Sequence, residues 1–287
     1  MKDYFGYKGK KCVVTGAATG MGAAGVDMML DLGAEVYTLD IAEVKAPVEK
    51  ALRVDLSDKA AIDEAFKQLP DKFDKFFGFA GVGGVKEDFV LTVKVNFLAN
   101  KYITEEYLTK RVNPGGAIAY ISSLGGIGWL EYQDEYKDVV EAQSYEEAVK
   151  LIQAKKLVQI PMPPGMLGYI FAKRALIYYS KVMVPEFAKN DIRINTVSPG
   201  ITQTPLLERE WMPAFGAQGI EAGNLGAVQR YAEPREMGHP IVFMNSDMAS
   251  YISGEDLKVD YGFKGLRDIA SENKQHFAGM GPTLEQG

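Results

Sequence analysis

Apolar positions along the chain follow two spacings, one typical of buried β-strands and one typical of amphipathic helices. Short apolar runs predict strands at residues 12–14, 35–39, 52–56, 75–81, 116–121, 191–197 and 256–259. Helical spacing predicts helices at residues 23–32, 60–69, 89–108, 169–189 and 233–245. Strands that alternate with helices are typical of an α/β fold, so we expect a doubly wound parallel sheet of about seven strands with helices on both faces.

One long segment interrupts this alternation. Residues 129–156 are rich in charge, and residues 161–165 form an apolar, proline-rich run. Ser144 and Glu147 have the spacing of a capping box that opens a short helix. We interpret residues 129–165 as an inserted helical flap, with a disordered excursion as the alternative.

The length and composition favour a single domain that spans residues 1–287. With 287 residues and 47% hydrophobic side chains, the chain is able to bury a sizeable core. The polar stretch at 267–287 has little apolar surface to bury, so we expect a loosely held tail there.

Charge and residue usage exclude several classes of function. A formal net charge of −6 leaves no basic footprint for nucleic acid, so no nucleic-acid partner is expected. The single cysteine, Cys12, lies in a predicted strand and is interpreted as a core residue, and two histidines without ligand spacing predict no metal site. The sequence has neither a run of about 18 apolar residues nor a signal-like start, which predicts a cytoplasmic protein without membrane contact.

A glycine-rich turn joins the first predicted strand to the first predicted helix. Gly16, Gly20 and Gly22 allow backbone conformations closed to other residues, and they let a phosphate approach main-chain N–H groups at the helix start. The spacing G-x-x-x-G-x-G differs from the G-x-G-x-x-G dinucleotide fingerprint. The turn therefore predicts a phosphate site whose kind depends on the rest of the chain.

Two further strand ends favour a dinucleotide. Asp40 closes the second predicted strand about 20 residues after the glycine turn, where Rossmann-type folds place a carboxylate for the ribose hydroxyls. An ordinary aspartate in a strand-ending turn is the alternative. A second glycine loop, Gly81 to Gly84, follows the fourth strand, so we expect both loops to border one crevice.

Candidate catalytic side chains lie downstream. Tyr169 and Lys173 are four residues apart and share one face of a predicted helix, while Ser123 follows the fifth strand. A lysine one turn away favours the phenolate of a tyrosine, whose ordinary pKa near 10 is too high for a base at neutral pH. Asn96 is an isolated amide in an otherwise apolar helix and needs a structural reason. A surface Tyr/Lys pair and an ordinary strand-end serine are the alternatives.

Together these motifs resemble the short-chain dehydrogenase/reductase family. The match spans about residues 9–261, with Phe79 in place of the family's usual asparagine and Tyr261 in place of its last glycine. The residues that carry it are Thr15-Gly16-x-x-x-Gly20-x-Gly22, Asp55-Leu56, Phe79-Ala80-Gly81, Asn96, Ser123, Tyr169-x-x-x-Lys173 and Pro199-Gly200.

The resemblance implies a catalytic tetrad of Asn96, Ser123, Tyr169 and Lys173. In this family the tyrosine moves the proton, the serine binds the substrate oxygen, the lysine also holds the ribose, and the asparagine supports a water chain. The cofactor contacts that the resemblance implies are Gly16, Thr19, Gly20, Met21, Gly22, Asp40, Ile41, Asp55, Leu56, Ala80, Gly81, Tyr169, Lys173, Pro199, Gly200, Thr202 and Thr204. Because Asp40 would repel a 2′-phosphate and no arginine follows the glycine turn, the expected cofactor is NAD.

The substrate is predicted from apolar residues in the flap and in the segment after Gly200. Met162, Leu167, Leu207, Met212 and Phe215 belong to this apolar set, although ordinary packing would explain many of them. The residues expected to contact substrate are Ser123, Trp129, Met166, Leu206 and Trp211.

The gap between Ser123 and Tyr169 is wider than the family usually shows, and it resembles the insertion of bacterial 3α-hydroxysteroid dehydrogenase/carbonyl reductases. The resemblance implies oxidation and reduction of a bulky hydrophobic alcohol and ketone, most simply a hydroxysteroid. It also implies a homodimer or homotetramer, with the dimer favoured because the insertion would obstruct one interface.

Two other functions compete with this interpretation. A reductase of carrier-linked 3-oxoacyl chains is disfavoured by Asp40 and by four acidic residues of the flap that we expect near the site, which are Glu131, Asp134, Glu135 and Asp138. A non-catalytic dinucleotide sensor is disfavoured by the complete tetrad.

Overall fold

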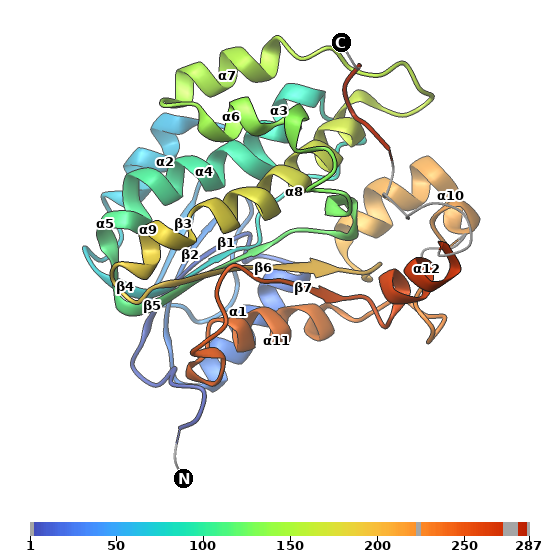
Figure 1. The fold of residues 1–287 in the computed structure, drawn as a ribbon. Helices are drawn as coiled ribbons and strands as arrows, with labels where there is room; N and C mark the ends of the chain where they lie inside the picture. Colours follow the sequence, from blue (N-terminus) through green and yellow to red (C-terminus); the bar gives the residue numbers. More distant parts are fainter. Residues whose placement is uncertain (1–2, 222–224, 272–280, 286–287) are drawn as a thin grey trace.

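A parallel β-sheet forms the centre of the fold (Figure 1). The computed structural model describes residues 3–221, 225–271 and 281–285. Within these ranges the sheet has seven strands in the order β3-β2-β1-β4-β5-β6-β7. The strands are β1 (Lys11–Thr15), β2 (Glu35–Asp40), β3 (Lys50–Arg53), β4 (Phe73–Gly78), β5 (Val112–Ile121), β6 (Arg193–Pro199) and β7 (Asp256–Val259). All neighbours are parallel and the strand order reverses between β1 and β4, which confirms the doubly wound prediction.

Side chains of the central strands point alternately to the two faces of the sheet. Val13 and Phe76 join the core on one face, whereas Cys12, Val14 and Phe77 join the core on the other. Helices cover both faces, so these strands are buried on both sides and appear in the sequence as continuous apolar runs.

Two helices cover the Cys12 face of the sheet. They are α1 (Gly20–Asp31) and α11 (Pro234–Met244), and they lie side by side (Figure 1). A Cβ atom at Gly238 would lie only 2.8 Å from the Gly25 amide nitrogen, so the helices approach this closely only with glycine at the contact.

The opposite face carries α2 (Lys59–Phe66), α8 (Pro164–Val182), α9 (Val184–Ala188) and a long helical run between β4 and β5. That run consists of α3 (Phe89–Val93), α4 (Ala99–Ile103) and α5 (Thr109–Arg111), joined by π-helical turns at Lys94–Leu98 and Thr104–Leu108. The predicted helix over 89–108 is therefore present, but two wide turns interrupt it. π turns inside helices are frequently found at functional sites.

The insertion forms an outer layer on these helices (Figure 1). Its helices α6 (Lys137–Glu141) and α7 (Tyr145–Gln153) contact α8 and α3, and Ala148 and Ile152 of α7 are buried. One half of the predicted capping box is present, because the Ser144 hydroxyl accepts a hydrogen bond of 3.1 Å from the Glu147 amide, whereas the Glu147 carboxylate accepts from the Gln143 amide at 2.8 Å instead of from Ser144. The expectation of a flap over the site is wrong for α6 and α7, because their apolar faces pack on the helix layer.

The end of the chain differs from the predicted loose tail. Helix α12 (Phe263–Ser271) includes the first residues of that stretch, whereas 272–280 and 286–287 lie outside the described residues. Residues 281–285 are held against the insertion: Thr283 is fully buried and its amide donates to Glu135 at 2.8 Å. The expectation is therefore wrong for 281–285, because residues distant in sequence provide partners for a polar segment.

Helix α10 (Met212–Glu221) and α12 lie beside the carboxyl ends of β6 and β7 (Figure 1). The π-helical turn Leu207–Trp211 leads into α10, and short 3-10 turns occur at Leu124–Gly126, Gln133–Glu135 and Asp247–Ala249. Within the described ranges, no helix combines the length and the apolar composition needed to cross a membrane.

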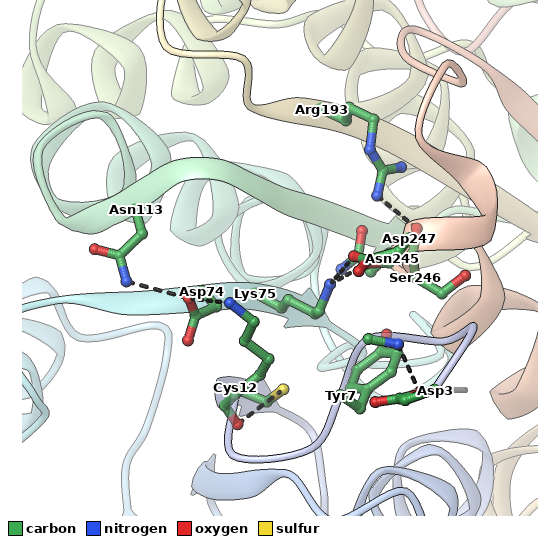
Figure 2. A network of polar contacts seen from close by, with 12 residues as sticks. Asp3, Tyr7, Cys12, Asp74, Lys75, Asn113, Arg193, Asn245, Ser246 and Asp247 are labelled. Atoms are coloured by element: carbon green, nitrogen blue, oxygen red, sulfur yellow. Dashed lines mark hydrogen bonds and ion pairs between the residues drawn. The ribbon is translucent and has the colours of Figure 1, made fainter. Parts of the chain in front are cut away.

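The amino-terminal ends of the strands are tied together by buried polar groups (Figure 2). Lys75 donates to the Asn245 carbonyl at 2.7 Å and lies 3.7 Å from Asp247, and Arg193 donates to the Ser246 carbonyl at 2.9 Å. Cys12 lies in the same region, and burial raises the pKa of its thiol to about 12. Its interpretation as a core residue is confirmed, and this network leaves the opposite end of the sheet for ligands.

Candidate active site

A cavity of about 1200 Å³ lies at the carboxyl ends of the parallel strands. The glycine turn and Asp40 line one part of it, and Ser123 and Tyr169 line another. Parallel strands bring their carboxyl ends to one edge of the sheet, so residues far apart in sequence meet where the strand order reverses. The expectation that both glycine loops border one crevice is confirmed, because Gly16 and Gly81 both line the cavity.

The glycine turn is built for close approach of main-chain atoms. Gly16 has φ of 72°, and a Cβ atom there would lie 2.4 Å from the Ala80 nitrogen. A Cβ atom at Gly22 would lie 1.9 Å from the Gly16 carbonyl oxygen. The turn leads directly into α1, whose first N–H groups have no partner within the helix and form a site for an anionic group.

Asp40 is fixed next to this turn. Its carboxylate accepts hydrogen bonds of 2.8 Å from the amides of Ala18 and Ala42. These bonds hold the carboxylate in the cavity wall, where it is placed to receive the hydroxyl groups of a ribose. The residues at this end fit a dinucleotide with a free 2′-hydroxyl.

The other residues that the resemblance implies for cofactor binding also line the cavity. Asp55 turns its carboxylate to the Ser57 amide at 2.8 Å, and the Thr202 hydroxyl donates to the Gly200 carbonyl at 2.9 Å. The remaining members of this set in the cavity wall are Thr19, Gly20, Met21, Ile41, Leu56, Ala80, Gly81, Pro199 and Thr204.

Phe79, which replaces the family's usual asparagine, packs between the sheet and helix α1, which follows the glycine turn. Its ring stacks on Phe77 with a centroid distance of 6.3 Å, and a Cβ atom at Gly25 would lie 2.8 Å from its ring edge. Apolar packing thus takes the place of a polar side chain at this position.

Asn96 is a supporting residue behind the cavity wall. It is fully buried in the π turn Lys94–Leu98, where its amide oxygen accepts from the Val82 amide at 2.8 Å and its nitrogen donates to the Val82 carbonyl at 3.0 Å. This pair of bonds holds the second glycine loop and explains the isolated amide in the sequence. Asn96 therefore acts on the site through the backbone of Val82 and does not line the cavity.

Lys173 carries its ammonium into the interior next to Tyr169. The Nζ atom donates to the Ile121 carbonyl at 2.8 Å and lies 5.5 Å from the centre of the Tyr169 ring. Burial lowers the pKa of this ammonium to about 8, so it remains mostly charged at neutral pH. It therefore provides a positive charge beside the phenol.

Ser123 faces Tyr169 from the end of β5. Its hydroxyl accepts from the Gly125 amide at 3.0 Å, which fixes the side chain at the start of the 3-10 turn. Burial raises the pKa of the Tyr169 phenol, and a hydrogen bond with Ser123 opposes that increase. Ser123, Tyr169 and Lys173 together form a site for moving a proton to or from an oxygen of a bound molecule.

Trp211 closes the other side of the cavity. Its indole nitrogen donates to the Gly83 carbonyl at 3.2 Å, and its ring meets the Tyr169 ring edge to face with a centroid distance of 5.4 Å. Met166 and Leu206 line the cavity as predicted, and Met162 and Phe215 also line it. The wall near Tyr169 is therefore largely apolar.

Trp129 does not reach the cavity, so its expected substrate contact is wrong. Its ring lies 6.5 Å from the Tyr178 ring, with the Lys181 ammonium 5.2 Å from the Trp129 ring centre. The chain after Ser123 runs along α8 and carries Trp129 to the far part of that helix. Leu167 and Met212, from the wider apolar set, also lie outside the cavity lining.

The acidic residues of the insertion are likewise absent from the cavity lining. Asp138 pairs with Lys155 at 2.7 Å, and Glu135 binds the amide of Thr283. The expectation that these carboxylates lie near the site is therefore wrong, because the insertion packs on the outer helix layer.

Several cavity residues were missed by sequence reasoning. Lys86, Glu87 and Glu210 line the wall near Gly83, although their residue types are typical of solvated surfaces. The Glu210 carboxylate lies against Gly83, and burial, together with the nearby Glu87 carboxylate, raises the Glu210 pKa. The sequence feature that could have indicated Glu210 is its position next to Trp211, which was predicted to contact substrate.

Known proteins are similar to this sequence over most of its length. The family model described as short chain dehydrogenase matches residues 10–136, and one described as Enoyl-(Acyl carrier protein) reductase matches residues 158–264. The chain is 32% identical over 254 residues to a coniferyl-alcohol dehydrogenase of Pseudomonas sp. (strain HR199 / DSM 7063), covering 88% of this chain and 96% of that protein. It is 27% identical over 257 residues to a 3-alpha-hydroxysteroid dehydrogenase/carbonyl reductase of Comamonas testosteroni, with the same two coverages of 88% and 96%.

The fold also matches a solved structure. The 3-alpha-hydroxysteroid dehydrogenase from Pseudomonas sp. B-0831, complexed with NADH, superposes with a TM-score of 0.70 at 24% identity over 92% of this chain and 99% of that chain. The doubly wound sheet that the NAD prediction requires is therefore present in this chain. On the motifs, the fold and these matches, the chain belongs to the short-chain dehydrogenase/reductase family.

Proposed function

We propose that this protein is an NAD(H)-dependent dehydrogenase that interconverts a secondary alcohol and a ketone on a bulky hydrophobic substrate, with hydroxysteroids as the first class to test. The observation that carries the proposal is the position of Trp211, whose ring stands 5.4 Å from the ring of Tyr169 in an apolar wall. A hydrophobic body placed there has its oxygen next to the phenol.

The preference for NAD over NADP rests on Asp40. Its carboxylate is held by two amide donors at 2.8 Å, so it cannot turn away from an approaching 2′-phosphate without losing both bonds. Repulsion between the Asp40 carboxylate and a 2′-phosphate therefore favours the cofactor with a free 2′-hydroxyl.

In the proposed reaction Ser123 hydrogen-bonds the substrate oxygen and Tyr169 takes or returns its proton. The bound nicotinamide supplies the hydride acceptor or donor. Burial raises the pKa of the Tyr169 phenol and the hydrogen bond with Ser123 lowers it, while the Lys173 ammonium, 5.5 Å from the ring centre, supplies a positive charge that favours the phenolate. Asn96 keeps the second glycine loop in place through Val82.

An aromatic alcohol is the second substrate class. The relative with 32% identity is a coniferyl-alcohol dehydrogenase, and the edge-to-face pair of Trp211 and Tyr169 suits a flat ring as well as a fused aliphatic body. Either class would use the same proton-transfer residues.

A panel assay tests the proposal. Purified protein is mixed with NAD or NADP and with a 3α-hydroxysteroid, an aromatic allylic alcohol or glycerol, and absorbance of the reduced nicotinamide is followed. We expect turnover with NAD and a bulky alcohol and little with glycerol. Tight NAD binding without turnover of any alcohol would instead support a dinucleotide sensor.

We further propose a homodimer. The support is that α6 and α7 cover the outer side of α3 and α8, which removes this helix surface from contact with a second copy. Light scattering coupled to size-exclusion chromatography tests it, and a tetramer would contradict it.

A further inference from the structure

A buried arginine stands directly behind the catalytic residues. Arg174 follows Lys173 on α8, and none of its surface is exposed. Its guanidinium lies 4.1 Å from the centre of the Tyr132 ring and 3.9 Å from the Glu135 carboxylate, and Nη2 has no hydrogen-bond partner within the described residues. Burying a guanidinium with one distant carboxylate is costly, so an apolar side chain would serve the core better. The arginine therefore calls for a role beyond packing.

The guanidinium holds the turn that carries Ser123. Its Nε atom donates to the Ile127 carbonyl at 3.1 Å. Ile127 closes the 3-10 turn that starts at Ser123, because its own amide donates to Leu124 at 3.0 Å and the Gly126 amide donates to the Ser123 carbonyl at 2.8 Å. Ile127 also lines the cavity.

The same helix holds the other side of Ser123. The Ser122 hydroxyl donates to the Lys173 carbonyl at 3.0 Å. Two consecutive residues of α8 thus bind the chain on both sides of Ser123. Lys173 binds Ser122 immediately before it, and Arg174 binds Ile127 at the end of its turn. A shift of Arg174 relative to Ile127 would move the Ser123 hydroxyl relative to Tyr169.

Residues 281–285 cover the arginine from the outside. Arg174 Nη1 donates to the Gly281 carbonyl at 2.8 Å. Thr283 binds Glu135 through its amide at 2.8 Å and its hydroxyl at 2.5 Å, and its carbonyl accepts from the Val158 amide at 3.2 Å. The segment is therefore fixed to the insertion on one side and to the guanidinium on the other.

We propose that Arg174 is a positioning residue for Ser123 and that residues 281–285 are the strap that keeps its guanidinium on the Ile127 carbonyl. This inference rests on the proposed function, in which Ser123 binds the substrate oxygen. Residues 281–285 do not line the cavity, so the strap would affect catalysis only through Arg174 and the Ser123 turn.

Two variants separate positioning from folding. Arg174→Lys keeps the charge but cannot reach both the Ile127 and the Gly281 carbonyl, and Thr283→Val removes only the hydroxyl bond to Glu135. Lys155→Ala is the matched control, because it breaks an ion pair of the same insertion without touching the strap. Deletion of residues 281–287 is the strongest perturbation.

We expect kcat to fall about 10- to 100-fold in Arg174→Lys and in the deletion, because small displacements of catalytic groups have effects of this size. Thr283→Val should lie between these and wild type. NAD affinity of the test variants should stay within about twofold of wild type. The kcat of Lys155→Ala should also stay within about twofold, a change well below that of a displaced catalytic group. The pH profile of alcohol oxidation should move to higher pH, because a displaced Ser123 no longer lowers the Tyr169 pKa. Wild-type kcat with an unchanged profile in Arg174→Lys would overturn the proposal.

Amide hydrogen exchange provides a readout that does not need activity. In Arg174→Lys and in the deletion, peptides covering residues 123–127 should exchange faster, whereas the glycine turn at 16–22 should exchange as in wild type. Equal acceleration in both regions would indicate a purely structural role and contradict the proposal. If the wild-type protein oxidises no alcohol, the proposed function fails while the exchange result still decides the positioning of the turn.

Discussion

Replacing Lys173 with methionine should change the pH dependence of stability in a measurable direction. Lys173 is 3% exposed, and burial lowers the pKa of its ammonium to about 8 from 10.5 in the unfolded chain. Below pH 8 both states carry the proton, and the folded state bears the full cost of the buried charge. Between pH 8 and 10.5 the unfolded chain binds more protons than the folded one, so stability increases with pH.

The magnitude follows from the separation of the two pKa values. A pKa unit corresponds to about 1.4 kcal/mol, so the buried charge costs about 3 kcal/mol at pH 7 and about 2 kcal/mol less at pH 9.5. The variant also loses the bond to the Ile121 carbonyl, which contributes about 1 kcal/mol. Lys173→Met should therefore be about 2 kcal/mol more stable than wild type at pH 7. At pH 9.5 the two should have nearly equal stability, and the variant should be inactive at both values.

Urea unfolding of both proteins at pH 7, 8 and 9.5 measures this difference. Lys189→Met replaces an exposed lysine whose side chain is 66% accessible, so it is the matched control and should keep the wild-type pH slope. A Lys173→Met variant that is less stable at pH 7, or whose difference from wild type does not change with pH, would refute the reasoning.

Three further predictions concern the cofactor, the cavity wall and the insertion. Asp40→Ala should lower the ratio of kcat/KM for NAD to that for NADP at least about tenfold by removing the repulsive charge; an unchanged ratio would exclude this role. Gly83→Ala places a Cβ atom 2.8 Å from the Trp211 indole nitrogen, so KM for a bulky alcohol should rise several-fold while Gly265→Ala, with open space around it, has no effect. Ile152→Ala should reduce the free energy of unfolding by about 2–5 kcal/mol in denaturant titrations without changing KM for large substrates. A raised KM with little loss of stability in Ile152→Ala would instead indicate that the insertion contacts the substrate.

The sheet and most of the candidate site could be predicted because their signals are local. Strands buried on both faces produce continuous apolar runs, and the carboxyl ends of parallel strands meet at one edge. Asp40, Ser123 and Tyr169 could therefore be brought together from sequence alone. The one-turn spacing of Tyr169 and Lys173 required only helix geometry.

The surroundings of the site depend on contacts that local patterns do not specify. The apolar face of α7 was visible in the sequence, but periodicity does not say whether Ala148 and Ile152 pack on a helix layer or over a cavity. Asn96 was visible in the sequence as an isolated amide that needs a structural reason, but its bonds to Val82 depend on a loop elsewhere in the fold. The strap at 281–285 is polar, so its sequence favours a loose tail unless the buried Arg174 and Glu135 are known.

The most direct measurement of the central claim compares wild type with Tyr169→Phe. The substitution removes one oxygen and leaves the ring that packs against Trp211. Equilibrium NAD binding is measured by titration, and NAD reduction is measured with the alcohol that the panel identifies. The proposed mechanism predicts NAD affinity within about twofold of wild type and a loss of at least about a hundredfold in kcat, the scale of positioned acid–base catalysis. Turnover close to wild type in Tyr169→Phe would contradict the assignment of Tyr169 as the group that moves the proton.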